Sequence, residues 1–334
     1  MGIFRNETEG RLRAPWRLLT HGALFVILTM ALSPFLPADV QEAGRAEIES
    51  MAVGEGLSIS TQTLMWWSLV ALAAGLLSTW IAATYIDHRR PPTLGLRLDG
   101  AWWTDFGVGI ALGFVVVGGA VAVGVASGWM EIVGGEPTEA PGFLPHLIVA
   151  SVAFLSIGIY EEIIIRGYQM TNLAEGLNLR RWSAATAVIA ALLLSSVVFG
   201  LLHAVNPGYS VLALINITLI SILALGLGYA VTGRLGLPIG LHTSWNFALG
   251  FVFGLPVSGV SMAEQPLLLT RATGPELWTG GAFGPEGGLL GTAAILAACA
   301  ALLLWTRRRE GDVAIRDHIA EPPAAAEDPQ APRE

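Results

Sequence analysis

The sequence contains no lysine and little charge of any kind. All 18 of its basic residues are arginines, and charged residues make up 13% of the 334 positions against 53% hydrophobic residues. A water-soluble domain of this length would have to bury far more apolar surface than usual. The composition therefore excludes an ordinary soluble globular protein and indicates a chain whose solvent is lipid.

Other missing features narrow the function further. A single cysteine, Cys299, excludes an intramolecular disulfide and a cysteine-based metal site, and its place in an apolar stretch indicates a small apolar filler. The chain has no HExxH motif, no glycine-rich phosphate loop after a strand and no repeat of fixed period. The net charge is −8, and no nucleic-acid-binding surface is visible in the sequence.

Eight apolar stretches, separated by polar or Gly/Pro-rich breaks, fit the roughly 20 residues needed to cross the hydrocarbon core. We therefore expect an all-α polytopic membrane protein, a bundle of about eight transmembrane helices. The stretches are 18–37, 64–86, 106–128, 144–168, 183–205, 210–231, 237–254 and 288–305.

The positions of the arginines predict the orientation. If the N-terminus is cytoplasmic, only Arg45 and Arg271 fall in outer loops, which otherwise carry acidic residues such as Asp39 and Glu131. Cytoplasmic segments are enriched in basic residues, so both termini are predicted to be cytoplasmic. The lysine-free composition further indicates a GC-rich prokaryotic genome, and hence a prokaryotic plasma membrane.

The predicted organisation is one membrane domain with two short flanking segments. Residues 1–17 form a cytoplasmic stub, and residues 18–305 form the transmembrane domain. Residues 306–334 are expected to be a disordered cytoplasmic tail, because Pro, Ala and acidic residues dominate its end and cannot support a core. The segments 38–63 and 255–286 are expected to fold over the outer face as loops.

Ionisable residues inside apolar stretches are costly, so they usually face a bundle interior or a watery cavity and mark function. Here they gather in three predicted helices. The motifs are Tyr160 to Gly167 (YEEIIIRG), Phe199 to His203 (FGLLH) and His242 to Asn246 (HTSWN).

Helical geometry separates the two adjacent glutamates. Glu162 and Arg166 are four residues apart, in the order that favours an ion pair on one helix face. Glu161 is rotated from Glu162 by about 100° and is free to face another group. One arginine cannot neutralise two carboxylates, which favours a functional site over the alternative of a buried ion-pair network.

The two histidines have partners of their own. Phe199 and His203 share a face, so the ring of Phe199 is expected to wall one side of the imidazole. His242 and Asn246 also share a face and present an imidazole beside an amide. Interhelical hydrogen bonding is the structural alternative for this last pair.

The hairpin of the fourth and fifth stretches predicts that Glu161 and His203 are level, because their midpoint is residue 182, beside Arg180 and Arg181 at the membrane edge. A carboxylate and an imidazole sharing a water form a plausible general base. His242 and Asn246 are then placed to stabilise the oxyanion of an attacked carbonyl. The reaction class is amide hydrolysis.

In this order on successive helices, E-E-x-x-x-R, F-x-x-x-H and H-x-x-x-N resemble the CAAX prenyl protease 2 and bacteriocin-processing family, also called CPBP or Abi. The resemblance covers residues 143–254, and the glycine-rich stretch 279–287 resembles bacterial members. It implies an eight-helix intramembrane endopeptidase. The implied roles are water activation by Glu161 and His203, an oxyanion hole of His242 and Asn246, and support from Glu162, Arg166 and Phe199.

The expected mechanism is glutamate-dependent and requires no cofactor. A Zn²⁺ ion held by Glu161, His203 and His242 stays open as an alternative, with Asn246 the weakest potential ligand. The expected partners are membrane lipid and a peptide or lipid-modified protein substrate, with no prediction of oligomeric state. Two other functions also stay open. They are a proton-coupled transporter and a noncatalytic bacteriocin-immunity or scaffold protein.

One point of the sequence argues against a shared site. Hydropathy places His203 near the outer end of its stretch and His242 near the inner end of its own. Pro207 and Pro238 are expected to break the adjoining segments and bring the two histidines level, since broken backbone is tolerated beside a watery cavity. Asn216 and His21 are interpreted as structural, and the glycines of the third, sixth and seventh stretches as sites of close helix packing.

Overall fold

The computed structural model describes residues 3–6, 10–135 except 53–56, and 142–323. Its core is an all-α bundle, and within these described ranges seven helices are long and apolar enough to cross a membrane. The chain is thus an integral, multi-pass membrane protein. These seven spans are Ala14–Phe35, Thr61–Ile86, Gly100–Ala126, Phe143–Leu177, Ala184–Val205, Val211–Thr232 and Leu289–Glu310.

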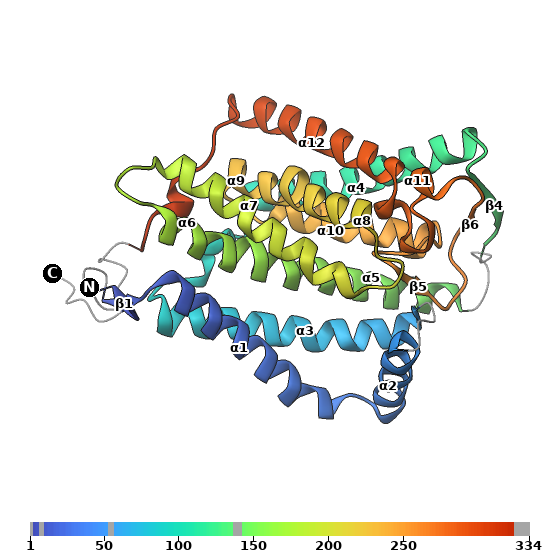
Figure 1. The fold of residues 1–334 in the computed structure, drawn as a ribbon, viewed down its shortest axis with the longest axis horizontal. Helices are drawn as coiled ribbons and strands as arrows, with labels where there is room; N and C mark the ends of the chain where they lie inside the picture. Colours follow the sequence, from blue (N-terminus) through green and yellow to red (C-terminus); the bar gives the residue numbers. More distant parts are fainter. Residues whose placement is uncertain (1–2, 7–9, 53–56, 136–141, 324–334) are drawn as a thin grey trace.

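Several spans are assembled from shorter elements (Figure 1). Helix α1 (Ala14–Leu32) ends in a 3₁₀ turn, η1 (Ser33–Phe35), and α3 (Thr61–Ile81) ends in a π-helical turn, η2 (Ala82–Ile86). Helix α4 (Gly100–Ala126) and α12 (Leu289–Glu310) are continuous. The fourth span joins α5 (Phe143–Glu162), the π-helix η4 (Ile163–Met170) and α6 (Thr171–Leu177). The fifth joins α7 (Ala184–Leu202) and η5 (His203–Val205). The sixth joins α8 (Val211–Ile220), the π-helix η6 (Ser221–Gly226) and α9 (Leu227–Thr232).

The predicted eighth crossing, 237–254, corresponds to α10 (Gly236–Phe247) and the π-turn η7 (Ala248–Val252). This helix is shorter than the other seven and is the most enclosed, since every residue from Gly236 to Asn246 is buried. An eighth crossing therefore stays a prediction. Pro238 lies in the first turn of α10, where backbone N–H groups have no partner within the helix, so proline is tolerated there. The predicted break at this proline therefore does not occur.

Small residues let α10 sit in the middle of the bundle. An added Cβ on Gly109 or Gly113 of α4 would lie within 3 Å of atoms of α10, and one on Gly240 would meet the backbone of Phe106. Gly158 of α5 approaches Thr243 as closely. The predicted role of glycines in close packing is confirmed for α4 and α10.

One end of the bundle is built from loops that are far apart in the sequence. We call it the loop end: the described residues 33–52, 57–60, 127–135, 203–210 and 253–288. Strand β3 (Leu57–Ile59) pairs with β5 (Val260–Met262), and β4 (Met130–Gly134) pairs with β6 (Leu269–Ala272). The short helix α11 (Glu276–Thr279) and the 3₁₀ turns η8 (Gly281–Phe283) and η9 (Pro285–Gly287) complete it (Figure 1). Segments predicted to share the outer face therefore do lie together.

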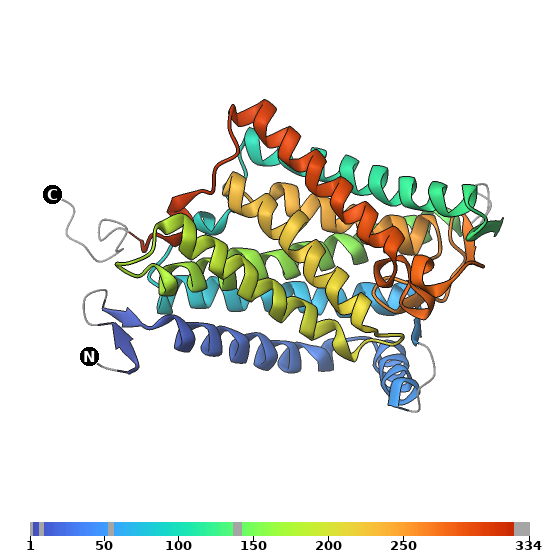
Figure 2. The same cartoon turned by 45° about the horizontal axis from the view of Figure 1, so that its top comes forward.

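The opposite end, which we call the arginine end, contains the described residues 3–6, 10–13, 87–99, 178–183, 233–235 and 311–323, including β1 (Arg5–Asn6), β2 (Arg11–Leu12) and η3 (Pro91–Leu94). The two ends are separated by the length of the helices in both views (Figures 1 and 2). The predicted hairpin turn beside Arg180, Arg181 and Trp182 is confirmed, because it lies between the end of α6 and the start of α7.

Two segments differ from the sequence-based expectation. Residues 38–52 were expected in a loop but form helix α2 (Ala38–Ala52), which begins at an acidic first turn and packs on α3. The tail is ordered further than expected, since α12 continues to Glu310 and residues 311–323, including η10 (Asp317–Ala320), pack against the bundle. Ile319 is 2% exposed and Asn178 donates to the carbonyl of Ala320. Apolar residues within an acidic tail thus fix it; residues 324–334 lie outside the described residues.

Charge at the arginine end is held in compact networks. Glu175 accepts hydrogen bonds from Arg11 and Arg17 at 2.7 Å each, and from Arg89. Asp87 is buried beside them and accepts from Tyr168 at 3.1 Å, and burial raises the pKa of its carboxyl to about 6.

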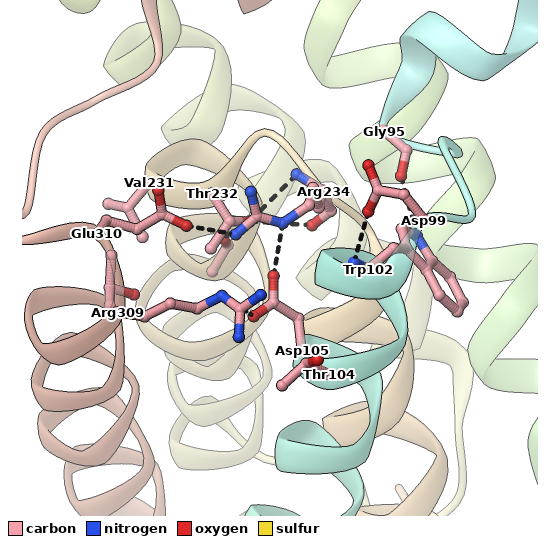
Figure 3. A network of polar contacts seen from close by, with 12 residues as sticks. Gly95, Asp99, Trp102, Thr104, Asp105, Val231, Thr232, Arg234, Arg309 and Glu310 are labelled. Carbon is pink, nitrogen blue, oxygen red and sulfur yellow. Dashed lines mark hydrogen bonds and ion pairs between the residues drawn. The ribbon is translucent and has the colours of Figure 1, made fainter.

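A second network joins α4 to α12 (Figure 3). Arg234 donates to Asp105 and to Glu310, both at 2.6 Å, and Trp305 donates to the second oxygen of Asp105. Despite desolvation, which lowers it, the two carboxylates raise the pKa of Arg234. The arginine end is therefore closed by paired charges.

Candidate active site

A cavity of about 160 Å³ lies among the central helices and extends to the loop end. The four predicted residues Glu161, His203, His242 and Asn246 all line it, together with Phe199. Its remaining walls are mostly apolar. They are formed by Leu64, Phe154, Ile157, Ile217, Ile220, Leu225, Leu241, Trp245, Val257, Val260 and Met262, with the polar residues Asn206, Ser258 and Glu286.

Glu162 and Arg166 form the predicted ion pair, with Arg166 Nη1 donating to Glu162 Oε1 at 2.7 Å. Both side chains are fully buried, at 0% and 1% exposure. Arg166 also donates to the hydroxyl of Ser221 at 2.6 Å, and its guanidinium lies over the Phe199 ring at 4.6 Å. These contacts tie α5, α7 and η6 together behind the cavity wall.

Glu162 has a second partner that the sequence did not predict. His242 Nδ1 lies 2.8 Å from Glu162 Oε1, and a carboxylate accepts, so Nδ1 carries the proton. This fixes the ring of His242 and leaves Nε2 as its other polar atom. Nε2 lies 3.8 Å from Oε2 of Glu161, so His242 sits between the two glutamates.

Glu161 is the more accessible of the two carboxylates. Its side chain is 20% exposed, whereas that of Glu162 is 0% exposed. Glu161 Oε1 accepts a hydrogen bond from the Tyr160 hydroxyl at 3.0 Å. The predicted rotation of Glu161 away from the ion pair is thus confirmed, and its carboxylate is exposed to the cavity.

His203 is oriented by its own helix. Its Nδ1 lies 2.8 Å from the carbonyl oxygen of Phe199, which can only accept, so Nδ1 is the protonated nitrogen. In the neutral ring Nε2 then keeps its lone pair. The rings of Phe199 and His203 are in contact, with centroids 4.6 Å apart, as their shared face predicted.

Asn246 contributes an amide to the cavity wall. The residue is 7% exposed, and its side-chain amide makes no hydrogen bond within the part of the chain that the structure describes. Phe199, whose ring meets that of His242 edge-on at 6.2 Å, separates this wall from the buried arginine. An amide held beside an open space is able to donate to an incoming oxygen.

Sequence reasoning missed three polar residues that line the cavity where it reaches the loop end, Asn206, Ser258 and Glu286; we call this part of the cavity wall the mouth. Glu286 accepts from Trp245 Nε1 at 2.9 Å, and from both the backbone N–H and the hydroxyl of Ser258, at 2.6 and 2.9 Å. The carbonyl of Ser258 in turn accepts from Asn206 at 2.8 Å. Ser258 has a φ of 47°, a strained value for a residue with a side chain. The sequence feature that could have identified Glu286 is its position in the glycine-rich stretch 279–287.

The remaining polar residues behave as predicted. Asn216 donates to the carbonyls of Glu286 and Gly288, which anchors this glycine-rich stretch. His21 is buried against Thr79 at 3.1 Å and stacks on Tyr168. Neither residue lines the cavity, so both are structural.

The apparent mismatch in depth between His203 and His242 does not separate them, because both line one cavity. Three π-helical segments adjoin the site: η4 follows Glu162, η6 begins at Ser221, and η7 follows shortly after Asn246. Such segments widen a helix locally and often occur at functional sites.

The ligand set considered for Zn²⁺ does not converge. No three His, Cys, Asp or Glu side chains in the described ranges lie close enough together to hold one metal ion. Glu161 Oε2 and His242 Nε2 lie 3.8 Å apart, and His203 does not complete a group of three with them among the described residues.

Comparison with known proteins gives one match. The model of the Rce1-like family, described as type II CAAX prenyl endopeptidase Rce1-like, matches residues 143–248. No curated protein and no solved structure matches the chain. The matched segment begins at the first residue of α5 and includes all three motifs. The family match supports an intramembrane protease, without specifying its substrate or the roles of individual residues. Residues 143–248 are therefore an Rce1-like domain of the CPBP family.

Proposed function

We propose that the protein is a glutamate-dependent intramembrane endopeptidase that cuts a peptide bond in a membrane-associated or lipid-modified substrate. The observation that carries the proposal is the meeting of Glu161, His203, His242 and Asn246 on one cavity inside an integral membrane bundle. Four polar groups from three helices would be costly there without a polar ligand. The lysine-free composition supports a prokaryotic plasma membrane as the location.

In the proposed reaction, a water molecule in the cavity lies between Glu161 and His203. Glu161 accepts a proton as the water oxygen bonds to the scissile carbonyl carbon, and the lone pair on His203 Nε2 orients the water. The C=O π electrons move to the carbonyl oxygen, forming a tetrahedral oxyanion. The proton then passes to the amide nitrogen, and the C–N bond breaks to release an acid and an amine.

The oxyanion would be stabilised by Asn246 and His242. With His242 Nδ1–H directed at Glu162, a second proton on Nε2 makes the ring a donor on its cavity side. That proton also brings the formal charges of Glu161, Glu162, Arg166 and His242 to zero, which favours it where lipid surrounds the bundle. Donors fixed before the reaction, such as these, are the usual source of oxyanion stabilisation.

The test is cleavage of a peptide library by purified protein in detergent or liposomes, with Glu161→Ala and His203→Ala as the site variants. Glu131→Ala is the matched control, because this glutamate is exposed at the loop end and does not line the cavity. We expect cleavage by wild type and control and none by the site variants. Equal cleavage by all four proteins would contradict the proposal.

A metal-free mechanism is part of the proposal, and it rests on the failure of the three candidate ligands to converge. We expect activity to survive stringent treatment with a strong chelator. Loss of activity that returns on adding Zn²⁺ would establish a metalloprotease instead.

A further inference from the structure

The mouth of the cavity belongs to the loop end of the bundle. Of the lining residues outside the helices, Asn206 follows η5, Val257 to Met262 include strand β5, and Glu286 is in η9. No residue of the arginine end lines the cavity. Any route from water to Glu161 through the described residues therefore begins among the loops.

The loop end holds these lining residues in a defined arrangement. Strand β5 pairs in parallel with β3, which precedes α3, and Gly259 donates to the carbonyl of Phe283. Glu286 clamps the Ser258 turn to Trp245 on α10. The mouth is thus a built structure attached to the helix that carries His242 and Asn246.

The other end offers no comparable route. Arg234, in the turn after α9, is bonded to Asp105 of α4 and Glu310 of α12 (Figure 3). Glu175 of α6 is bonded to three arginines, which come from β2, α1 and the segment after η2. The ordered tail packs over this end through Arg316, whose Nε donates to the carbonyl of Val231 at 2.8 Å. Opening a route here would separate these ion pairs, and those of Glu175 with Arg11, Arg17 and Arg89 are buried.

The distribution of charge indicates which end is cytoplasmic. Fourteen of the 18 arginines, including Arg307, Arg308 and Arg309, lie in or next to the described segments of the arginine end, against Arg45 and Arg271 at the loop end. This bias towards the cytoplasmic side is the strongest sequence determinant of membrane orientation. The mouth of the cavity consequently faces away from the cytoplasm.

We propose that the site is reached from the extracytoplasmic side, so that its substrate is an exported or outward-facing peptide segment rather than the cytoplasmic tail of a protein. The inference rests on the proposed function. The cavity walls are mostly apolar, and 160 Å³ is close to the ~150 Å³ of an apolar cavity that admits a benzene-sized group. The substrate class is a peptide that presents one large apolar side chain beside the bond to be cut.

Accessibility of single cysteines tests the direction of access. In a Cys299→Ala background, Met262→Cys marks the mouth, His203→Cys marks the cavity, and Arg180→Cys marks the exposed turn of the arginine end. Each full-length variant is exposed to a membrane-impermeant maleimide in right-side-out and in inverted plasma-membrane vesicles, because only a thiol in contact with water reacts.

We expect Met262→Cys and His203→Cys to be labelled in right-side-out vesicles, and Arg180→Cys only in inverted vesicles. Labelling of the two cavity positions only from the side that labels Arg180→Cys would overturn the inference. So would labelling of neither cavity position from the right-side-out face. Met262 lies in strand β5, outside the helices that carry the catalytic residues, so it reports even if the His203 variant folds poorly.

Labelling needs no catalysis, which separates the two proposals. If cysteines label as expected but Glu161→Ala cleaves as well as wild type, the proposed peptidase fails and the access route stands. If peptide cleavage depends on Glu161 but the cavity labels from the arginine end, only the access route fails.

Discussion

The arginine end and the central cavity bury charge in opposite ways. At the arginine end, Glu175 is surrounded by three arginines and is 2% exposed. In the cavity, the side chain of Glu161 is 20% exposed, and its polar partners among the described residues are the hydroxyl of Tyr160 and, at 3.8 Å, His242. A buried carboxylate whose oxygens are all paired with cations holds a fold together. A carboxylate beside a cavity that still has free acceptor positions is able to exchange protons. The contrast indicates that burial of charge alone does not identify a site.

Replacing the cavity carboxylate gives the largest effect. Glu161→Gln keeps the size of the side chain but removes the proton acceptor, so we expect peptide cleavage to fall by about 10²–10⁴-fold. The midpoint of thermal unfolding in detergent should change little, because Glu161 has no cationic partner at hydrogen-bonding distance among the described residues. If the midpoint of thermal unfolding falls together with the cleavage rate, Glu161 has a structural role like that of Glu175.

The matched change at the other end is Glu175→Gln. It leaves the buried Arg11, Arg17 and Arg89 without their shared carboxylate, and we expect the free energy of unfolding to fall by about 3–5 kcal/mol. An SDS titration in mixed micelles measures this loss. Cleavage by the fraction that stays folded should remain near wild type, and a specific loss of turnover would remove the distinction between the two ends.

Asn246→Ala separates transition-state stabilisation from substrate binding. Removal of one oxyanion donor costs about 10²–10³-fold in kcat with little change in KM. Steady-state kinetics on a peptide cleaved by wild type measures both constants. Thr243→Ala, three residues earlier on α10 and outside the cavity lining, is the control. A rise in KM alone would mean that Asn246 binds substrate and does not stabilise the oxyanion.

The smallest effect concerns pH. The pKa of Asp87 is raised by burial to about 6 from an ordinary value of 3.8, so the folded state binds more protons than the unfolded state between these values. Its contribution to stability is therefore full below pH 4 and is lost as the pH rises through 6, by at most ~3 kcal/mol. The difference in unfolding free energy between wild type and Asp87→Asn should follow this course.

Asp99→Asn is the control for the pH series. Asp99 is exposed, and its hydrogen bond from the N–H of Trp102 lowers the pKa of its carboxyl. Its titration therefore falls below the window, and the variant should show no change in slope between pH 4 and 6. A flat difference for Asp87→Asn would show that its carboxyl is already charged throughout.

The sequence predicted more of the site than of the loops. Four-residue spacing on a helix is set by local geometry, so the pair of Glu162 with Arg166 and the shared face of Phe199 with His203 followed from the chain alone. The contact of His242 with Glu162 joins residues 80 apart in the sequence and depends on how α10 packs on α5. No local pattern specifies that packing.

Helix α2 and the packed part of the tail are two further features that local sequence patterns did not predict. An acidic segment such as 38–52 has no membrane-like signal, and the burial of Ile319 depends on a surface formed by other helices. Glu286 was visible only as part of a glycine-rich stretch, since its function as a clamp requires Ser258 and Trp245 to come from other parts of the chain.

By itself, the sequence determined that this is a multi-pass membrane protein and which polar residues its helices carry, because the cost of placing charge and open backbone in lipid acts on each segment separately. Only the tertiary structure decided which of those residues meet. It placed Glu161, His203, His242 and Asn246 on one cavity and Glu175 among arginines, because the packing of small residues between helices and the widened π-helical turns set the distances across the bundle.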